Sequence, residues 1–117
     1  MSAGGGRAAI IGVWQSERWA NLVVVTFEWD VRKAAANFKK HGVTFEDAAS
    51  VFFDPLATTF PDPDHSLDEI RELTVGYTME GELVFVSHCE REERIRIISA
   101  RRATLAEQRQ YEEGNGG

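Results

Sequence analysis

The order of apolar and polar positions divides the chain into predicted strands and helices. A β-branched run over residues 22–29 is typical of a strand. Asp30 is a good helix N-cap, and the apolar spacing over residues 32–41 predicts a helix. Gly42 is the expected stop signal after it.

A second helix is predicted directly after the first. Thr44 is a suitable N-cap, and Asp47 stands three residues later as a capping-box-like partner. Pro55 closes this helix, because the residue before a proline avoids the helical conformation. The apolar stripe of the helix consists of Phe45, Ala48, Ala49 and Phe52.

Short strands dominate the second half of the chain. Two prolines in three residues make residues 61–66 an irregular loop. Turns at residues 79–82 and 90–93 link the last strands into an antiparallel meander. A last helix begins near Thr104, with Glu107 as its capping-box partner. The predicted strands cover residues 56–60, 70–78, 83–89 and 94–100.

The resulting order, β-α-α-β-β-β-β-α, predicts an α+β fold in which helices pack on one face of a small antiparallel sheet. The 117 residues fit one domain, which we place at residues 22–113. Residues 1–21 lie outside the pattern and are expected to form a poorly ordered appendage. Residues 114–117 are expected to form a flexible tail.

The net charge of −6 at first disfavours a nucleic-acid partner. The charge is uneven, however: residues 44–72 carry −7, while residues 28–42 and 88–102 each carry +2. Two basic segments are therefore available for phosphate. No apolar run approaches the roughly 20 residues that span a bilayer, and no signal peptide is evident. With Cys89 as the single cysteine, we expect a cytoplasmic protein without membrane contact.

Several blocks of the sequence resemble the BrnT family of toxins. The opening block is Glu28-Trp29-Asp30 with Lys33 and the run from Asn37 to Phe45, and the closing block runs from Arg94 to Thr104. Between them, the matching residues are Asp54-Pro55, Asp64-His65-Ser66, Glu69-Ile70-Arg71 and Gly76. The resemblance covers roughly residues 27–113.

This resemblance implies a toxin of a type II toxin–antitoxin system with a RelE-like fold. It implies a ribonuclease that halts translation, and a BrnA-type antitoxin as partner in a hetero-oligomer. The antitoxin would be a DNA-binding dimer, so this chain would reach DNA only through it, while RNA is its own substrate. A non-catalytic module that binds protein or RNA is the alternative.

RNA can be cut without a metal or any other cofactor, because its 2′-hydroxyl attacks the adjacent phosphorus. The protein must then supply a base, an acid and cations. Arg94 and Arg96 are two apart on a predicted strand, so their side chains share one face. Strict alternation places Ile98 on that face as well. Arg101, at the strand end, is expected to point into the region of Arg96. Solvent exposure is the alternative explanation for these arginines.

Further candidates for the acid and base lie on neighbouring segments. His88 and Glu90 share a face, and pairing through the turn at 90–93 would place His88 across from Arg94 and Arg96. The alternative for His88 is a polar residue on a solvated sheet face. The other catalytic candidates are His65, Glu69 and Arg71. His65 could instead be a loop residue that bonds its neighbours, and Glu69 and Arg71 could simply pair with cross-strand charges.

A metal site is the less favoured interpretation of the acidic loop. Asp62, Asp64 and His65 match no strong ligand spacing and would form an incomplete coordination shell. We therefore expect neither a metal nor another cofactor.

Basic residues of the first predicted helix are candidates for RNA binding. Lys33 and Lys40 are seven apart and share a face with Asn37, so they could contact the RNA backbone or an acidic antitoxin segment. A solvated helix face is the alternative explanation. The predicted RNA-binding residues are Lys33, Lys40, His41, Arg94 and Arg102.

Overall fold

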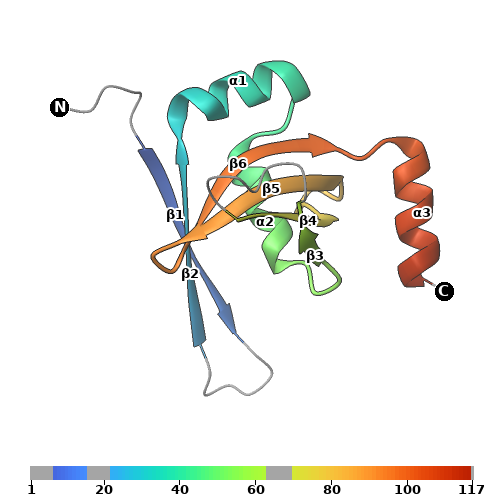
Figure 1. The fold of residues 1–117 in the computed structure, drawn as a ribbon. Coiled ribbons are helices and arrows are strands. Elements are labelled where there is room, and N and C mark those ends of the chain that lie inside the picture. The colour runs from blue at the N-terminus through green and yellow to red at the C-terminus, as the bar shows by residue number, and fades with distance from the viewer. Residues whose placement is uncertain (1–6, 16–21, 63–69, 117) are drawn as a thin grey trace.

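The structure is a computed structural model that describes residues 7–15, 22–62 and 70–116. Its centre is a six-stranded sheet in the order β1-β2-β6-β5-β4-β3 (Figure 1). The strands are β1 (Arg7–Gln15), β2 (Leu22–Asp30), β3 (Thr58–Pro61), β4 (Arg71–Tyr77), β5 (Leu83–Arg91) and β6 (Arg94–Arg102). The helices are α1 (Val31–His41), α2 (Phe45–Ser50), the 3-10 turn η1 (Val51–Phe53) and α3 (Leu105–Gly116).

The predicted α+β fold and the element order from residue 22 onward are confirmed. Strands β3 to β6 form the expected antiparallel meander. The sheet as a whole is mixed, because β2 pairs with β6 in parallel over Thr26–Glu28 and Arg94–Arg96. Parallel pairing needs a long crossover connection, and here the two helices and three strands between β2 and β6 supply it.

The sequence pattern predicted no element before residue 22, yet β1 pairs with β2 along its whole length. The two strands form a hairpin that extends away from the rest of the sheet (Figure 1). That residues 1–21 form an appendage to the domain stays a prediction.

The predicted helix caps are all present. The Asp30 carboxylate accepts from the Arg32 backbone N–H at 2.8 Å, and Gly42 ends α1 at φ 73°, a conformation that glycine adopts without strain. The Thr44 hydroxyl accepts from the Asp47 N–H at 3.0 Å. Thr104 and Glu107 form a reciprocal capping box, with N–H to side-chain distances of 2.9 and 3.1 Å.

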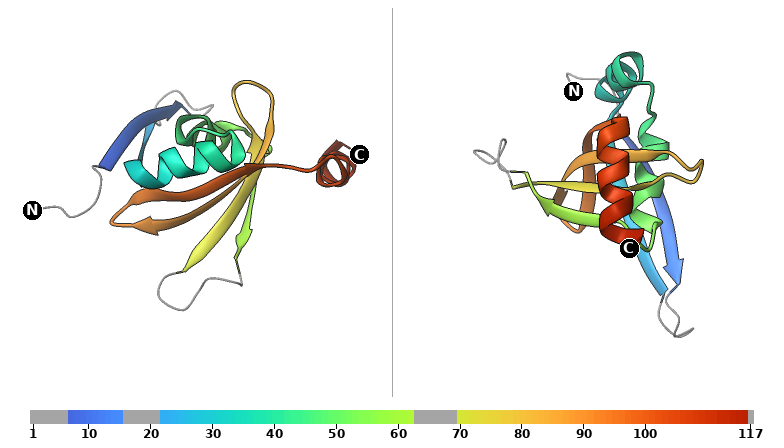
Figure 2. Two further views of the ribbon diagram at one scale, coloured as in Figure 1. Left: turned by 90° about the horizontal axis from the view of Figure 1, so that it is seen from above. Right: turned by 90° about the vertical axis from the view of Figure 1, so that its right-hand side faces the viewer.

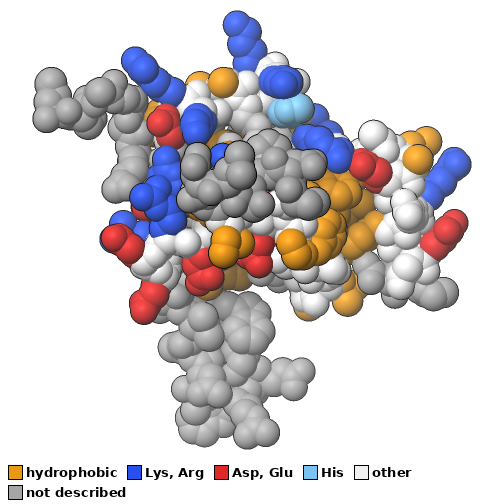
Figure 3. Space-filling model, in the orientation of Figure 1, with side chains coloured by type: hydrophobic (Ala, Val, Ile, Leu, Met, Phe, Trp, Pro, Cys, Tyr) orange, Lys and Arg blue, Asp and Glu red, His pale blue; other side chains and the backbone are white. Residues whose placement is uncertain are grey.

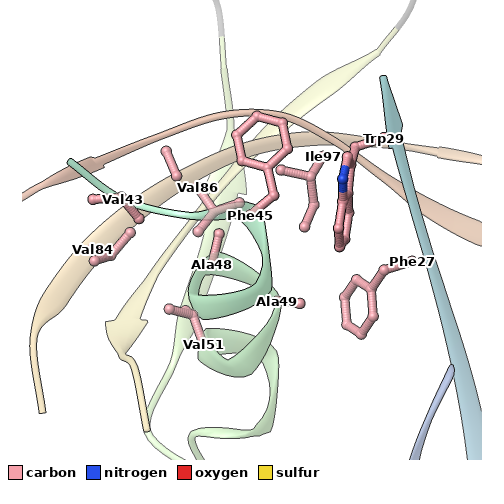
Figure 4. Close-up of a cluster of buried hydrophobic side chains, with 11 residues drawn as sticks. Phe27, Trp29, Val43, Phe45, Ala48, Ala49, Val51, Val84, Val86 and Ile97 are labelled. Atoms are coloured by element: carbon pink, nitrogen blue, oxygen red, sulfur yellow. The ribbon is translucent and has the colours of Figure 1, made fainter. Parts of the chain in front are cut away.

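The hydrophobic core lies between α2 and one face of the sheet. Phe45, Ala48 and Ala49 of α2 point at the strands, and Phe27, Trp29 and Ile97 meet them from β2 and β6 (Figure 4). The Trp29 and Phe45 rings meet edge to face at 5.9 Å. We call this side of the sheet the helix face and the opposite side the open face.

Helix α3 stands apart from α1 and α2, beyond the end of β6 (Figure 2).

A β-bulge interrupts β6 in its middle. Ser87 pairs with Ser99, but His88 pairs with Ile97, so Ile98 is an extra residue without a partner on β5. Strict alternation from Arg94 and Arg96 would place Ser99 and Arg101 on the opposite face. The extra residue reverses the alternation, and Ser99 and Arg101 therefore lie on the open face with the two arginines.

Asn37 joins α1 to β6. Its side-chain Nδ2 donates to the Ala100 carbonyl at 2.9 Å and to the Val43 carbonyl at 3.1 Å, and its Oδ1 accepts from the Ala100 N–H at 3.1 Å. Asn37 is only 7% exposed. It therefore bonds the protein backbone, and not RNA or an antitoxin as the sequence suggested.

We expect Asn37→Leu to lower the free energy of unfolding by about 2–4 kcal/mol, because it leaves the buried polar groups of Ala100 and Val43 without partners. Chemical denaturation measures this loss. The matched control is Gln108→Leu, which removes an amide from a partly exposed position on α3 and should change stability by about 0.5 kcal/mol or less. A loss below about 1 kcal/mol for Asn37→Leu would show that this bond set is dispensable.

Candidate active site

The open face carries side chains from β4, β5 and β6 in rows that run across the strands. One row consists of Arg71, Cys89 and Arg96, and the Glu28 side chain of β2 extends it. The next consists of Leu73, Ser87 and Ser99, and the third of Val75, Phe85 and Arg101. Charged groups therefore lie at two ends of this face with hydroxyl and apolar groups between them.

A cavity of about 250 Å³ opens beside Arg101. We call it the Arg101 cavity. Helix α1 contributes its last residue, His41, and the chain after β3 contributes the buried Asp62. The remaining lining residues are Leu73, Phe85, Ser87, Ser99, Ala100 and Arg101. An imidazole, a carboxyl group and a guanidinium thus border one hollow, which is the combination that acid–base chemistry on a phosphate requires.

Three neighbours hold the Arg101 guanidinium in place, one of them the Arg102 carbonyl, which accepts from it at 3.2 Å. Glu107 of α3 accepts two bonds from it, at 2.9 and 3.0 Å. The guanidinium carbon lies 4.6 Å from the centroid of the Phe85 ring, in a cation–π contact. Arg101 is thereby presented to the cavity in a defined orientation.

The pair also sets the charges at the site. Hydrogen bonds from Arg101 and from the Thr104 backbone lower the pKa of Glu107 to about 2. In return, the bond to Glu107 raises the pKa of Arg101. Both groups are therefore ionised at neutral pH, and a carboxylate this acidic is a poor proton acceptor. Glu107 positions Arg101 and does not suit the role of general base.

Arg94 and Arg96 form a second cationic group around one carboxylate. Glu28, whose side chain is 8% exposed, accepts from Arg94 at 3.4 Å and from Arg96 at 3.5 Å. Arg96 and Arg101 pair with Cys89 and Phe85, four residues apart on β5, so roughly 13 Å separates them at about 3.3 Å per residue. The two arginines share a face, as expected, but they do not meet at one point.

His88 lies on the helix face, away from all of these arginines. Its Nε2 is 2.7 Å from the Thr74 hydroxyl, and its ring packs edge to face on Phe52 at 4.8 Å. Burial lowers its pKa to about 4. The expected grouping of His88 with Arg94 and Arg96 on one face was wrong, because β5 pairs His88 with Ile97, a core residue.

Comparison with known proteins decides the family. Residues 29–107 match the family described as the ribonuclease toxin, BrnT, of type II toxin–antitoxin systems. The chain belongs to this BrnT family. The fold is similar to the crystal structure of the Brucella abortus ribonuclease toxin BrnT, at 25% sequence identity and a TM-score of 0.52. That match covers 66% of this chain and 94% of the Brucella chain. No curated protein matches.

Membership of the BrnT family makes this chain a ribonuclease toxin, and a type II system supplies a protein antitoxin as its partner. Within the described part of the chain, no helix is long and apolar enough to cross a membrane. The same residues contain no group of three or more His, Cys, Asp or Glu side chains placed to hold a metal ion.

The remaining predicted site residues of the BrnT-family chain are spread over several places. Arg71 lies in the row of Arg96, and Glu90 is exposed near the end of β5. Arg102 bonds the His41 and Gly42 carbonyls at 3.2 and 3.3 Å and Glu82 at 3.0 Å. This fixes the end of α1. Lys33 and Lys40 are exposed on α1, while His65 and Glu69 lie outside the described residues.

Sequence reasoning about this BrnT-family chain missed three residues of the Arg101 cavity. The sequence indicated Asp62 only as a possible metal ligand, and it did not indicate that Ser87 and Ser99 lie together. Their placement depends on strand register and on the bulge, which local sequence does not encode. Alternation along β5 could have placed Ser87 with Phe85, but not opposite Ser99.

The buried imidazole of His88 should make stability depend on pH. Between pH 6.5 and about 4, the His88 imidazole is protonated in the unfolded chain but neutral in the folded chain. The free energy of unfolding therefore falls as the pH drops through this range. The full loss is about 3 kcal/mol. Urea denaturation at several pH values measures it.

His88→Gln should flatten this dependence, whereas the control His41→Gln should keep it, because His41 is only partly buried at the end of α1. Identical pH slopes for the wild type and His88→Gln would contradict the assignment.

Proposed function

We propose that this BrnT-family toxin is a metal-independent endoribonuclease of the mRNA interferase type, which cleaves RNA at the Arg101 cavity and thereby inhibits translation. The observation that carries the proposal is the convergence of His41 and Arg101 on one cavity, with Arg101 held by Glu107 and Phe85. The family supplies the ribonuclease activity, and the cavity supplies groups that act without a metal.

The chemistry follows from these groups. His41 accepts the proton of the ribose 2′-hydroxyl while the 2′-oxygen attacks the adjacent phosphorus. The Arg101 guanidinium stabilises the negative charge that develops on the non-bridging phosphate oxygens. The bond from phosphorus to the 5′-oxygen breaks, the leaving oxygen takes up a proton, and a 2′,3′-cyclic phosphate remains. His65 and Glu69 stay candidates for delivering that proton.

The remaining cations would hold the RNA on either side of the cut. Arg94 and Arg96 lie on the open face roughly 13 Å from Arg101, so they can bind a phosphate further along the strand. Arg71 lies in the same row as Arg96 and can contribute. Lys33 and Lys40 of α1 remain candidates for contact with the RNA backbone, with Lys40 directly before His41.

A BrnA-like antitoxin, a DNA-binding dimer, is proposed as the partner that neutralises the toxin in a hetero-oligomer. The outer surface of α1 suits a protein partner, because Phe38 is 54% exposed among lysine side chains. An antitoxin segment with apolar and acidic residues would complement it.

We expect purified protein to cleave single-stranded RNA in EDTA and to leave 2′,3′-cyclic phosphate ends. Arg101→Gln should lower the rate about 10²–10³-fold, as the loss of one preorganised cation at a developing charge does. His41→Gln should lower it by about 10²–10⁴-fold. Arg109→Gln, which removes an exposed cation of α3 that lines neither cavity, is the matched control and should cleave at the wild-type rate.

Binding of RNA without any cleavage product, in the absence of antitoxin, would overturn the proposal in favour of a non-catalytic module. Full activity of Arg101→Gln with an unchanged melting temperature would overturn the site.

In cells, induced expression should arrest growth, and coexpression of a BrnA-like antitoxin should restore it. Arg101→Ala and Arg96→Ala should relieve the arrest while the proteins still accumulate, since both lose a phosphate contact. Mapping of RNA 5′ ends after induction checks that cleavage accompanies the arrest. Wild-type arrest by both variants would count against the open face as the site.

A further inference from the structure

A second cavity, of about 380 Å³, lies between the open face and α3. We call it the α3 pocket. Its lining residues are Phe60, Val75, Phe85, Glu107, Gln110 and Tyr111. Figure 3 shows hydrophobic side chains gathered on this side of the molecule, next to the C-terminal helix. The mechanism proposed above leaves this pocket unused.

The α3 pocket adjoins the Arg101 cavity. Phe85 lines both, and Glu107 lines the α3 pocket while it holds the Arg101 guanidinium. The guanidinium lies 4.6 Å from the Phe85 ring centroid. A ligand whose phosphate binds Arg101 therefore has its neighbouring group at the entrance of the α3 pocket.

The lining is aromatic and largely preformed. Phe60, Phe85 and Tyr111 contribute three rings, and Val75, at 4% exposure, contributes an apolar wall. The Tyr111 hydroxyl donates to the Leu56 carbonyl at 2.7 Å, and its ring meets Tyr77 at 6.0 Å. Planar, apolar walls of this kind are what single-stranded RNA-binding proteins present to unstacked bases.

Polar groups at the pocket give the means to select a base. The exposed Gln110 side chain carries both a donor and an acceptor, which matches the mixed pattern on the edge of a nucleobase. Glu107 is already engaged by Arg101 and Thr104. Of these two side chains, Gln110 is therefore the one available to form hydrogen bonds with the edge of a base.

We propose that the α3 pocket is a nucleobase subsite, which holds a base adjoining the scissile phosphate and which uses Gln110 to select among bases. The inference rests on the proposed function, since it takes single-stranded RNA as substrate. An apolar peptide would not need the adjacent guanidinium, whereas a nucleotide uses the ring pocket and the cation together.

The test compares short RNA substrates that carry either a base or an abasic ribose on each side of the cleaved bond. One of the two abasic substrates should be cleaved with a kcat/KM about 5- to 150-fold lower than the intact RNA, the range expected for one base–aromatic stack. Tyr111→Leu should lower kcat/KM for the intact RNA and leave the abasic substrate unaffected. Tyr111→Phe, which keeps the ring, should retain the wild-type preference.

Two further variants complete the experiment. Gln110→Ala should reduce the difference in cleavage rate among the four bases at that position. Met79→Ala, which removes an exposed apolar side chain from the β4–β5 turn and lines neither cavity, is the control and should leave all rates unchanged. Melting temperatures check that each variant is folded.

Equal cleavage of abasic and intact substrates by the wild type would overturn the subsite while the proposed function stands. Loss of antitoxin binding by Tyr111→Leu with unchanged cleavage would overturn it as well. Absence of cleavage of any RNA would contradict the proposed function instead. In that case, titration with uncleavable 2′-O-methyl RNA still tests the subsite, because abasic RNA should bind about 5- to 150-fold more weakly.

Discussion

The side-chain amide of Asn37 bonded to the backbone of Ala100 is the contact on which the arrangement of the site depends. Among the described strands, β2 pairs with β6 only over Arg94–Arg96, and beyond that point none of them lies beside β6 on this side. The amide gives and receives a hydrogen bond at Ala100, as a residue of an adjacent strand would. The residue after Ala100 is Arg101, and α1 ends at His41. One buried amide therefore keeps the imidazole and the guanidinium beside the same cavity.

The bulge in β6 has an equally direct consequence. Without the extra residue Ile98, alternation would place Arg101 on the helix face, where a guanidinium would face the apolar core. The bulge turns Arg101 to the open face, where its guanidinium contacts the Phe85 ring and bonds the Glu107 carboxylate. Bulges commonly occur next to active sites because they redirect a side chain without ending the strand.

The two faces of the sheet divide stability and chemistry between them. The helix face holds the aromatic core and His88, whose imidazole is kept neutral by burial. The open face holds the arginines, the hydroxyls of Ser87 and Ser99, and the two cavities. Helix α3 contributes to the second face, because Glu107 and Tyr111 bring its side chains to the sheet edge. The chain as a whole thus carries a negative net charge, although several arginines gather on the open face.

The sequence alone determined the elements that local physics specifies. Caps at Asp30 and Thr44, the stop at Gly42 and the capping box at Thr104 and Glu107 are short-range hydrogen bonds, and each was predicted correctly. The alternating strands and the family motifs were likewise legible, because periodicity and motif spacing are properties of the chain itself. The α+β class and the family could therefore also be predicted from the sequence.

Tertiary structure decided which side chains meet. A strand pattern does not reveal its register or a bulge, so it could not show that His88 points into the core or that Arg101 joins the open face. Nor could it show that Asp62, His41 and Arg101 share a cavity, because they come from three separate segments. Contacts between distant segments arise from the packing of the whole sheet, and the site of this BrnT-family toxin consists of such contacts.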